Sequence, residues 1–401
     1  MTETLTLTKL NEVYLHIKCS QGVAYELADY FSFRVPNAHF IPSVRDKIWD
    51  GYIRLFDRRD NSLYYGLLPY VEKFSKDRSY NIIRAESITG QSPYSLAEAA
   101  EFIEEMIQTG LPLKPRKYQV KNYADAIRNE RALFVSPTAS GKSLVIFLIA
   151  AYYDLKTLII VPTTSLVSQM YTDFADYAGK EWAEENIHRV TAGRDKGSEK
   201  QVVISTWQSI YKLGRGYFEQ YQLVIGDEAH LFQAKSLKAI MTKLTDCKYR
   251  FGFTGTLDGM ETNKLVLEGL FGTVNHIVST KKLIDQKYLA DFRIKTLILK
   301  HTEEERQAAR KFTYHQEMDY LVSHGRRNIF IRNLAVSLEG NTLLLFQYVD
   351  KHGKQLFQAI KERIENDSQK SPQGSANVHY IHGGVAADNR EEIRNIVNSG
   401  R

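Results

Sequence analysis

The stretch Arg131-Ala-Leu-Phe-Val-Ser-Pro-Thr-Ala-Ser-Gly-Lys-Ser143 decides the fold of the largest part of this chain. Its apolar start predicts a buried β-strand, and its Gly-Lys-Ser end opens the apolar segment 144–153, which predicts a helix. A strand, a loop and a helix in this order form a cradle for phosphate, because backbone N–H groups and the helix dipole favour an anion. The sequence therefore predicts a phosphate-binding loop.

Two side chains of this loop have predicted roles in holding ATP. Lys142 is expected to reach the β- and γ-phosphates, and Ser143 is expected to coordinate Mg²⁺ through its hydroxyl. The loop departs from the G-x-x-x-x-G-K-[ST] pattern, because Ser136 stands where the first glycine is usual, so a chance Gly-Lys-Ser stays open for the loop alone. The residues of the loop that we predict to bind the nucleotide are Thr138, Ala139, Ser140, Gly141, Lys142 and Ser143.

An acidic pair follows a second predicted strand, Tyr221-Gln-Leu-Val-Ile-Gly226, in the sequence Asp227-Glu-Ala-His230. Open α/β sheets bind ligands at the carboxyl ends of their strands, so the pair is expected to lie beside the phosphate loop. We predict that Asp227 holds Mg²⁺ and that Glu228 orients and deprotonates the attacking water. The catalytic residues predicted are thus Lys142, Asp227 and Glu228, with ATP and Mg²⁺ as cofactors and His230 as a further nucleotide contact.

Length and composition agree with a multidomain protein of a reducing compartment. The chain has 401 residues, a formal net charge of +6 and a pI near 8.9, a mild excess that suits a polyanionic partner. Cys19 and Cys247 are the only cysteines, which excludes a disulfide framework and a cysteine-rich zinc site. The polar start of the chain does not read as a secretory signal, and the run 144–153 is too short to span a bilayer. We expect a cytoplasmic protein that makes no use of a membrane.

The chain divides into four predicted parts. Residues 1–90 alternate short strands with a helical stretch and read as a small α+β domain. Residues 91–113 form a connector, whose helix starts at the capping box Ser95-Leu-Ala-Glu98. Residues 114–272 and 273–401 each alternate strands and helices, the pattern of α/β domains with a parallel sheet. The further strands predicted are 157–161, 201–205 and 249–253 in the first of these domains and 292–298, 341–346 and 378–381 in the second.

Polar clusters follow three of the strands in the domain 114–272. One such cluster is usually a helix cap, but parallel strands bring their carboxyl ends to one edge, so several clusters together predict a binding edge. The residues that we predict to grip a nucleic-acid strand there are Thr163, Thr164, Thr206 and Trp207, although a buried structural tryptophan stays an alternative for Trp207. Thr254 and Thr256 are predicted to couple ATP occupancy to this edge.

In this order the motifs resemble those of superfamily two helicases. Arg116-Lys-Tyr-Gln119 resembles the adenine-reading motif, in which Arg116 or Tyr118 stacks on the base and Gln119 pairs with its edge. The phosphate loop, the Asp-Glu-Ala-His box and the clusters at 161–165, 206–208 and 254–256 resemble the other motifs of that superfamily. The resemblance implies two RecA-like motor domains facing each other across ATP, which open and close to move along a nucleic acid.

The first ninety residues resemble the front domain of the UvsW-type branch-migration helicases of phages. The resemblance rests on Phe40-Ile-Pro42, Trp49-Asp-Gly-Tyr-Ile-Arg-Leu55 and Gly66-Leu-Leu-Pro69. It implies an ATP-dependent DNA helicase for forks, junctions and displaced-strand loops in recombination, replication and repair, in the cytoplasm of an infected host. The sequence itself leaves the oligomeric state and the partner proteins open; we expect a monomer, with phage recombination or single-strand-binding proteins as candidate partners.

Basic and aromatic residues interleave in the same stretch, as on a surface that binds phosphates and stacks bases. We predict DNA contacts for Arg45, Lys47 and Arg54. The alternative is that neighbouring aspartates neutralise these charges and that the aromatic residues form the core of a small domain. For the whole chain, an RNA helicase, a duplex translocase that does not unwind, and an ATP-gated DNA-binding module stay open as alternative functions.

The end of the chain gives a last expectation. In the family, the stretch resembling 389–399 is followed by a further strand, a coupling motif and arginines that reach the γ-phosphate, whereas this chain stops at Arg401. An arginine of that kind contributes roughly 10³–10⁵ in rate. We expect residues 1–401 alone to bind ATP and DNA, to show little DNA-stimulated hydrolysis and no unwinding, and to have an incomplete second sheet.

Overall fold

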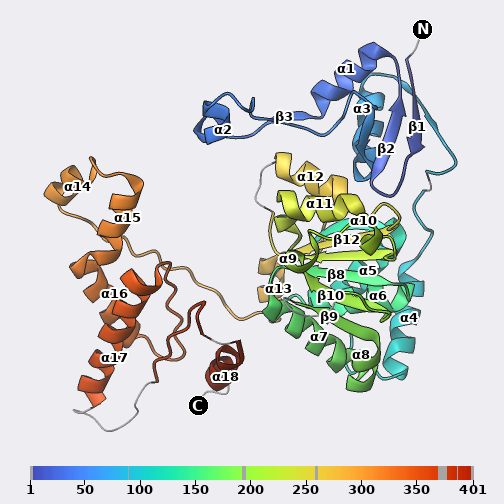
Figure 1. Cartoon of the computed structure of the whole chain (residues 1–401). Coiled ribbons are helices and arrows are strands. Elements are labelled where there is room, and N and C mark those ends of the chain that lie inside the picture. Colours follow the sequence, from blue (N-terminus) through green and yellow to red (C-terminus); the bar gives the residue numbers. More distant parts are fainter. Residues whose placement is uncertain are drawn as a thin grey trace. The chain divides into compact units, whose positions relative to one another are not determined.

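The structure, a computed structural model, describes residues 3–88, 90–191, 196–257, 261–368, 377–385 and 387–398. The chain divides into two compact units, Met1–Phe292 and Arg293–Arg401 (Figure 1). The first unit contains a small N-terminal domain and a large α/β domain. Among the described residues, no helix combines the length and the apolar composition needed to cross a bilayer.

The N-terminal domain is built on a four-stranded mixed sheet in the order β5-β2-β1-β6. Alternate apolar residues of two central strands, Leu5 and Leu7 in one and Leu15 and Ile17 in the other, are fully buried, as expected for a sheet with one covered face. The strands are β1 (Thr4–Lys9), β2 (Tyr14–Lys18), β5 (Ser62–Tyr64) and β6 (Asn81–Arg84), and the helices that pack with them are α1 (Gln21–Tyr30) and α3 (Leu68–Asp77). The predicted α+β character of this domain is confirmed.

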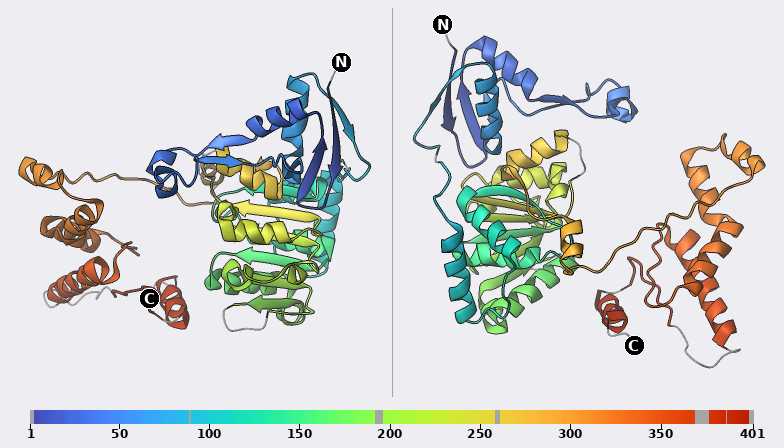
Figure 2. Two further views of the ribbon diagram at one scale, coloured as in Figure 1. Left: turned by 45° about the horizontal axis from the view of Figure 1, so that its top comes forward. Right: turned by 180° about the vertical axis from the view of Figure 1, so that it is seen from behind.

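A narrow extension leaves the four-stranded sheet, and we call residues 32–54 the arm. It consists of the antiparallel pair β3 (Ser32–Arg34) and β4 (Tyr52–Arg54), with the short helix α2 (Pro42–Arg45) at its far end. The views in Figures 1 and 2 show this ribbon projecting from the domain, with α2 held away from the sheet. Its tip therefore presents its side chains to solvent.

The large α/β domain has a seven-stranded sheet in the order β13-β7-β12-β11-β8-β10-β9, and all of its strand pairs are parallel. Its strands are β7 (Arg131–Val135), β8 (Thr157–Val161), β9 (Ile187–Val190), β10 (Val202–Thr206), β11 (Leu223–Asp227), β12 (Tyr249–Thr254) and β13 (Val274–His276). Five of them are the predicted strands, so the α/β fold class is confirmed here. The two that the sequence did not reveal, β9 and β13, are the short edge strands.

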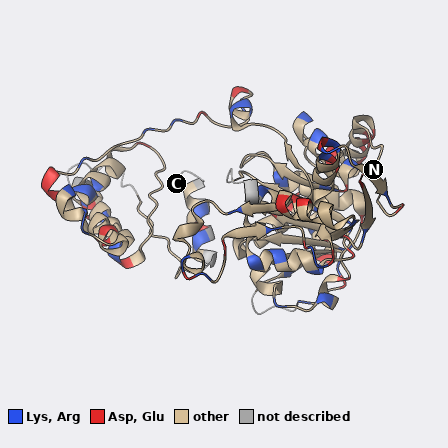
Figure 3. Ribbon diagram, turned by 90° about the horizontal axis from the view of Figure 1, so that it is seen from above, with Lys and Arg blue, Asp and Glu red and all other residues tan. Residues whose placement is uncertain are grey.

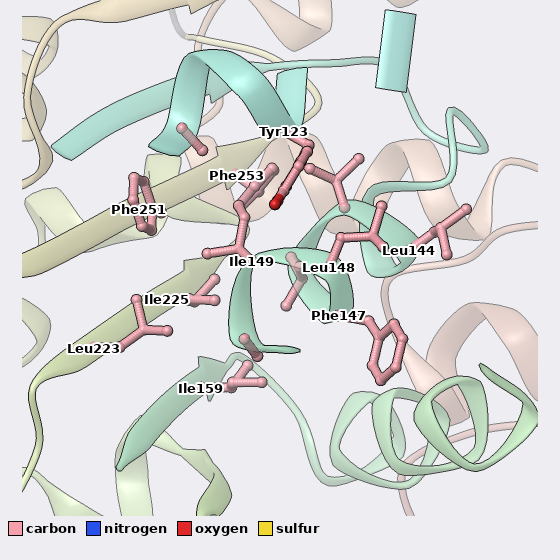
Figure 4. Close-up of a cluster of buried hydrophobic side chains, with 14 of the residues drawn as sticks. Tyr123, Leu144, Phe147, Leu148, Ile149, Ile159, Leu223, Ile225, Phe251 and Phe253 are labelled. Atoms are coloured by element: carbon pink, nitrogen blue, oxygen red, sulfur yellow. The ribbon is translucent and has the colours of Figure 1, made fainter. Parts of the chain in front are cut away.

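Helices cover both faces of this sheet, which explains why its strands are continuous apolar runs. On one face α6 (Lys142–Tyr153) supplies Leu144 to Ala150 to the core, in one cluster with Ile159 and Ile225 of the strands (Figure 4). The other helices of this domain are α4 (Leu96–Gln108), α5 (Lys117–Asn129), α7 (Thr164–Ala178), α8 (Lys180–Asn186), α9 (Trp207–Ile210), α10 (Arg215–Phe218), α11 (Lys235–Lys243), α12 (Glu261–Phe271) and α13 (Thr280–Asp285). The capping box predicted at Ser95 and Glu98 starts α4.

The N-terminal domain is joined to the large domain by buried arginines. The Arg250 side chain is fully buried at the start of β12 and donates hydrogen bonds to the backbone oxygens of Glu12, at 3.0 Å, and Met241. Arg131 donates to the backbone oxygen and to the carboxylate of Glu12, both at 3.2 Å, and lies 4.3 Å from the centre of the Tyr65 ring. The turn after β1 is therefore fastened to the amino ends of two central strands.

A second contact joins the two domains near α12. Gly66 packs so closely there that a Cβ atom would lie 2.1 Å from the backbone oxygen of Glu268. The Tyr70 hydroxyl donates to the buried Glu268 carboxylate at 2.6 Å, and that carboxylate also accepts the N–H of Val274 at 3.0 Å. The two contacts together fix the N-terminal domain on the large domain.

The second unit is helical where the structure describes it. Its helices are α14 (Glu303–Ala309), α15 (Tyr314–Ser323), α16 (Gly325–Ser337), the π-helical turn η4 (Val349–Gly353), α17 (Lys354–Ser368) and α18 (Ala387–Asn398). Glu305 joins two of these elements, because its carboxylate lies 3.1 Å from Nε2 of His324 at the start of α16. A backbone hydrogen bond from Thr302 and the bond with His324 lower the pKa of Glu305 to about 2.

The strands predicted at 292–298, 341–346 and 378–381 are not formed in this structure. Strands need partners that satisfy their backbone groups and a layer that covers one face. Instead, the apolar side chains of two of these segments lie open, with Ile294 78% and Leu343 82% exposed. The boundary predicted at residue 272 also differs from the structure, because β13 extends the first sheet and the first compact unit ends at Phe292. Residues 399–401 lie outside the described part of the chain.

Candidate active site

The predicted phosphate loop joins β7 to α6, and its backbone curls around a space in front of the helix. Ala139 and Gly141 have positive φ values, 62° and 74°, which turn successive N–H groups toward the same side, as in an anion-binding nest. Two features favour glycine at position 141. Its φ is positive, and a Cβ atom there would lie 2.4 Å from Nε2 of Gln119. The Lys142 ammonium lies 3.5 Å from the backbone oxygen of Ser136, folded back over the loop.

Ser136 replaces the usual first glycine of the loop, and the structure shows how a serine fits. Its side chain is buried, and its hydroxyl donates to the hydroxyl of Ser140 at 2.7 Å across the base of the loop. Its backbone N–H donates to Thr254 at the end of β12 at 2.9 Å. The substitution thus closes the loop with a side-chain hydrogen bond and leaves the nest of N–H groups open.

Gln119 lies under the phosphate loop. Its amide N–H groups donate to the backbone oxygens of Ser140, at 3.1 Å, and Gly141, at 3.2 Å, and its oxygen accepts the N–H of Arg116 at 2.8 Å. Both donors of the amide are therefore used, and an adenine base would have to displace them in order to pair with Gln119. The predicted contact of Gln119 with adenine stays a prediction.

The other two residues of that motif reach the same loop. The Tyr118 hydroxyl donates to the Ser140 oxygen at 2.8 Å and accepts a hydrogen bond from Arg116 at 3.0 Å. The Arg116 guanidinium lies 4.1 Å from the centre of the Tyr288 ring, so Tyr288 already covers one face of the cation. Arg116, Tyr118 and Gln119 thus support the loop, and stacking on a base stays a prediction for the first two.

The acidic pair lies at the carboxyl end of β11. Burial raises the pKa of Asp227, and the nearby Lys142 ammonium opposes that rise, which places the loop lysine close to this carboxylate. Glu228 has φ 50° and ψ 50°, a left-handed conformation that is uncommon for a glutamate and that is found where a side chain must be aimed precisely. Its backbone N–H donates to Oδ1 of Asp227 at 3.0 Å.

His230 connects the acidic pair with the end of β12. Its Nδ1 lies 2.9 Å from the Thr254 hydroxyl and 3.4 Å from the Glu228 carboxylate. Because the Thr254 hydroxyl donates to the backbone oxygen of Thr256 at 2.8 Å, Nδ1 carries the proton and donates to Thr254. The predicted coupling residues Thr254 and Thr256 are therefore linked to Glu228 by a continuous chain of polar contacts.

The residues predicted to grip a strand end neighbouring strands of the same sheet. Thr163 and Thr164 are exposed, and the Thr163 side chain caps α7 by accepting the N–H of Leu166. Thr206 is buried and its hydroxyl is 2.9 Å from that of Ser209, while Trp207 is half-buried against the core beside Tyr211. The two exposed threonines are the more accessible part of this edge.

The donor set of the site suits a nucleotide with a hard divalent cation. The Ser143 hydroxyl and the Asp227 carboxylate offer oxygen ligands, which Mg²⁺ prefers, and the nest of N–H groups offers donors to phosphate oxygens. The site can therefore bind a phosphate-bearing ligand, screen its charge and present Glu228 to a water molecule.

Comparison with known proteins agrees with this geometry. Residues 7–84 match the N-terminal domain of the DNA helicase UvsW, and residues 112–259 match the family of the type III restriction enzyme res subunit. The ATP-dependent DNA helicase UvsW of phage T4 is 29% identical over 401 residues, which covers 97% of this chain and 77% of that protein. A crystal structure of T4 UvsW helicase is 30% identical, with a TM-score of 0.62, and covers 69% of this chain and 100% of that one.

The chain belongs to the UvsW helicase family. A second T4 UvsW structure extends the similarity to 100% of this chain and 78% of that one, at 27% identity and a TM-score of 0.63. The DNA 3'-5' translocase XPB2 of Sulfurisphaera tokodaii is 27% identical over 220 residues, 53% of this chain and 48% of that protein. The resemblance drawn from the motifs of the UvsW-type helicases is confirmed.

One contact at the site was not predicted from the sequence. The Tyr177 hydroxyl, on α7, lies 3.0 Å from the Ser143 hydroxyl. A tyrosine on an amphipathic helix is usually part of the core, and the sequence carries no further signal that would have singled it out. The way α7 crosses α6 decides this contact, and periodicity does not reveal that geometry.

We expect Asp227→Asn to stabilise the ligand-free protein while abolishing turnover in the intact enzyme. Burial raises the pKa of Asp227, so its charge costs folding free energy, a cost that grows as pH rises through the folded-state pKa. Asparagine keeps the shape of the side chain without its charge. Removing such a buried charge at a functional site typically raises the free energy of unfolding by about 1 kcal/mol. Thermal unfolding in EDTA measures the gain. Asp176→Asn, an exposed position, is the control, and a lower midpoint for Asp227→Asn would contradict the assignment.

Proposed function

We propose that this chain is an ATP-dependent DNA helicase that acts on branched DNA, with Mg²⁺ as the metal of its ATP site. The observation that supports this most strongly is the meeting of the phosphate loop, the acidic pair and His230 at one edge of a parallel sheet. The N-terminal domain typical of UvsW is fixed on that same sheet. These observations support ATP hydrolysis next to a domain suited to DNA recognition.

At the ATP site, each residue has a separate task. Lys142 and the N–H nest hold the phosphates, and Ser143 and Asp227 hold Mg²⁺, which when bound offsets the negative charge of the phosphate oxygens. Glu228 orients a water molecule for in-line attack and takes its proton. The left-handed backbone of Glu228 donates its N–H to Asp227, and the Glu228 carboxylate lies 3.4 Å from Nδ1 of His230.

The occupancy of the site is passed on through His230. A change at Glu228 alters the hydrogen bond from His230 to Thr254, and Thr254 in turn holds Thr256 and the amide of Ser136. Thr254 ends β12, and β11 separates this strand from β8, which precedes Thr163, and from β10, which ends at Thr206. The strands are parallel, so their carboxyl ends lie along the same edge of the sheet. A rearrangement on hydrolysis would therefore reach the edge that we propose to grip DNA.

The arm is the part of the N-terminal domain that suits a DNA branch. Phe40 is 76% and Ile48 81% exposed at its tip, beside the exposed basic residues Arg45 and Lys47. Exposed apolar side chains next to cations fit a junction, where base pairs end and phosphates converge. Figure 3 shows that Lys and Arg are interspersed with Asp and Glu over the ribbon, so local placement matters more than net charge.

Arg54 is less suited to DNA than its position in the sequence suggests. Its guanidinium forms two hydrogen bonds with Asp50, at 3.2 and 2.5 Å, and this pairing lowers the pKa of Asp50 to about 2. A phosphate would have to compete with that carboxylate. We therefore propose Arg45 and Lys47 as the leading contacts and keep Arg54 as a secondary one.

If the arm contacts DNA phosphates, removing its basic residues should weaken the salt dependence of fork binding. The double substitution Arg45→Ala and Lys47→Ala is expected to reduce the slope of log K against log salt by about two units, because each phosphate contact contributes about one. Fluorescence anisotropy with a labelled fork, titrated at several salt concentrations, measures the slope. The same titration with linear duplex is expected to change less.

Lys76→Ala is the matched control for this test, because Lys76 is an exposed lysine of the same domain outside the arm. Its slope should stay at the value of the unaltered protein. An unchanged slope in the arm variant, or an equal loss of slope in the control, would contradict the proposed DNA contacts of the arm. Neither result would bear on the assignment of the ATP site, because ATP affinity is measured in a separate experiment.

A further inference from the structure

The magnesium ligand proposed above is held from behind by α7. The Ser143 hydroxyl lies 3.0 Å from the Tyr177 hydroxyl, near the end of that helix. The Tyr177 ring is itself fixed, because it packs 5.5 Å from the ring of Phe147, one turn further along α6. The position of Tyr177 is therefore set by the core and not by solvent.

Asp173, one turn before Tyr177, reaches the same hydroxyl. Burial raises the pKa of Asp173, and a hydrogen bond from Ser143 opposes the rise, so Ser143 donates to this carboxylate. Burial is the main cause of the raised pKa of Asp227, and the charge of Asp173 adds to it. The two carboxylates therefore interact electrostatically. The charges of Asp173 and Glu228 thus both raise the pKa of Asp227, whereas that of Lys142 lowers it.

This arrangement meets a chemical need of the ligand. A serine hydroxyl that binds a cation through its oxygen keeps its proton, and that proton needs an acceptor on the side away from the ion. Partners of this kind orient metal ligands, and their loss typically costs 10–100-fold in metal affinity. Ser143 has such an acceptor in Asp173, and Tyr177 restricts the rotation of the same hydroxyl.

We propose that Asp173 and Tyr177 are positioning residues of the magnesium site, which turn the Ser143 hydroxyl so that its lone pair faces the cation. The inference rests on the proposed function, because it takes Ser143 as a ligand of the metal that accompanies ATP. It adds two residues of α7 to a site that otherwise consists of the phosphate loop and the Asp-Glu-Ala-His box. It also accounts for the half-buried carboxylate of Asp173 on this face of α7.

The test measures metal affinity directly rather than turnover. Mn²⁺ is titrated into the ADP complex of each variant, and free Mn²⁺ is followed by electron paramagnetic resonance. Asp173→Asn is expected to weaken Mn²⁺ binding by about 10-fold or more. Tyr177→Phe, which removes one hydrogen bond, is expected to weaken it by about 5-fold. ADP affinity in EDTA should stay unchanged in both variants.

Asp176→Asn is the matched control, because it removes the same charge from an exposed position of the same helix. It should change Mn²⁺ affinity by less than about 2-fold. Full Mn²⁺ affinity in Asp173→Asn and Tyr177→Phe, or an equal loss in the control, would overturn the proposal. Tyr177→Phe keeps the ring packed on Phe147, so it gives a result even if Asp173→Asn folds poorly.

Ser143→Ala separates this inference from the proposed function. A loss of Mn²⁺ affinity in Ser143→Ala together with unchanged Asp173 and Tyr177 variants would overturn the positioning role alone. Full affinity in Ser143→Ala would instead overturn the metal site itself, and the positioning role with it.

Discussion

Replacing Glu228 with glutamine is expected to lower ATP turnover in the intact enzyme by about 10²-fold or more while ATP affinity stays unchanged, the scale of a lost general base. Glutamine keeps the size of the side chain, and the hydrogen bond from the backbone of residue 228 to Asp227 does not involve the side chain. The phosphate loop and the metal ligands therefore stay in place. Single-turnover hydrolysis and equilibrium binding of a fluorescent ATP analogue measure the two quantities.

Lys142→Ala is the comparison for that experiment, because it should weaken nucleotide binding as well as turnover. The lysine lies over the loop and close to Asp227, where it would meet the phosphates. A Glu228→Gln enzyme that turns over ATP at a near-normal rate would reject the assigned base. A Glu228→Gln enzyme that has also lost ATP binding would show that the glutamate holds the site together instead.

Replacing Arg250 with alanine is expected to destabilise the protein by about 3 kcal/mol and to loosen the N-terminal domain. The substitution removes the side-chain donor to the backbone oxygen of Met241 and one of the two arginine donors to that of Glu12, and it opens a cavity; each of these costs free energy. Burial lowers the pKa of Arg250 to about 10, so the guanidinium still carries its charge at neutral pH. The midpoint of urea unfolding measures the loss.

Limited proteolysis gives the second readout for Arg250→Ala, with faster cleavage expected in the connector 91–113 once the contact between Arg250 and Glu12 is lost. Arg215→Ala is the control, because Arg215 is 60% exposed and its loss should cost less than about 1 kcal/mol. An Arg250→Ala protein with an unfolding midpoint and a cleavage rate like those of the control would show that the two domains are held by other contacts.

The central sheet and the outline of the ATP site could be predicted from the sequence. The strands of the sheet are buried on both faces, so they are continuous apolar runs, and parallel pairing then brings Ser143, Asp227 and Thr254 to one edge. These are consequences of local pattern and of one topological rule. The family resemblance drawn from the same motifs is confirmed by the comparisons.

Contacts that depend on three-dimensional packing could not be predicted. The amide of Gln119 has several possible partners, and only the approach of α5 to the phosphate loop shows that it meets Ser140 and Gly141. Arg250 lies inside an apolar strand, and its burial under Glu12 depends on a domain contact that no local pattern shows. The strands predicted after residue 290 depend on partners distant in the sequence, which an apolar run does not supply.

Stimulation of ATP hydrolysis by nucleic acids in the intact enzyme tests the central claim most directly. The rate is measured with a fork, a linear duplex, single-stranded DNA and RNA at equal nucleotide concentration, with Glu228→Gln as the blank. The account predicts stimulation by DNA, strongest with the fork, and a weaker preference for the fork in the arm variant Arg45→Ala and Lys47→Ala. Equal or stronger stimulation by RNA, or DNA binding without any stimulated hydrolysis, would contradict it.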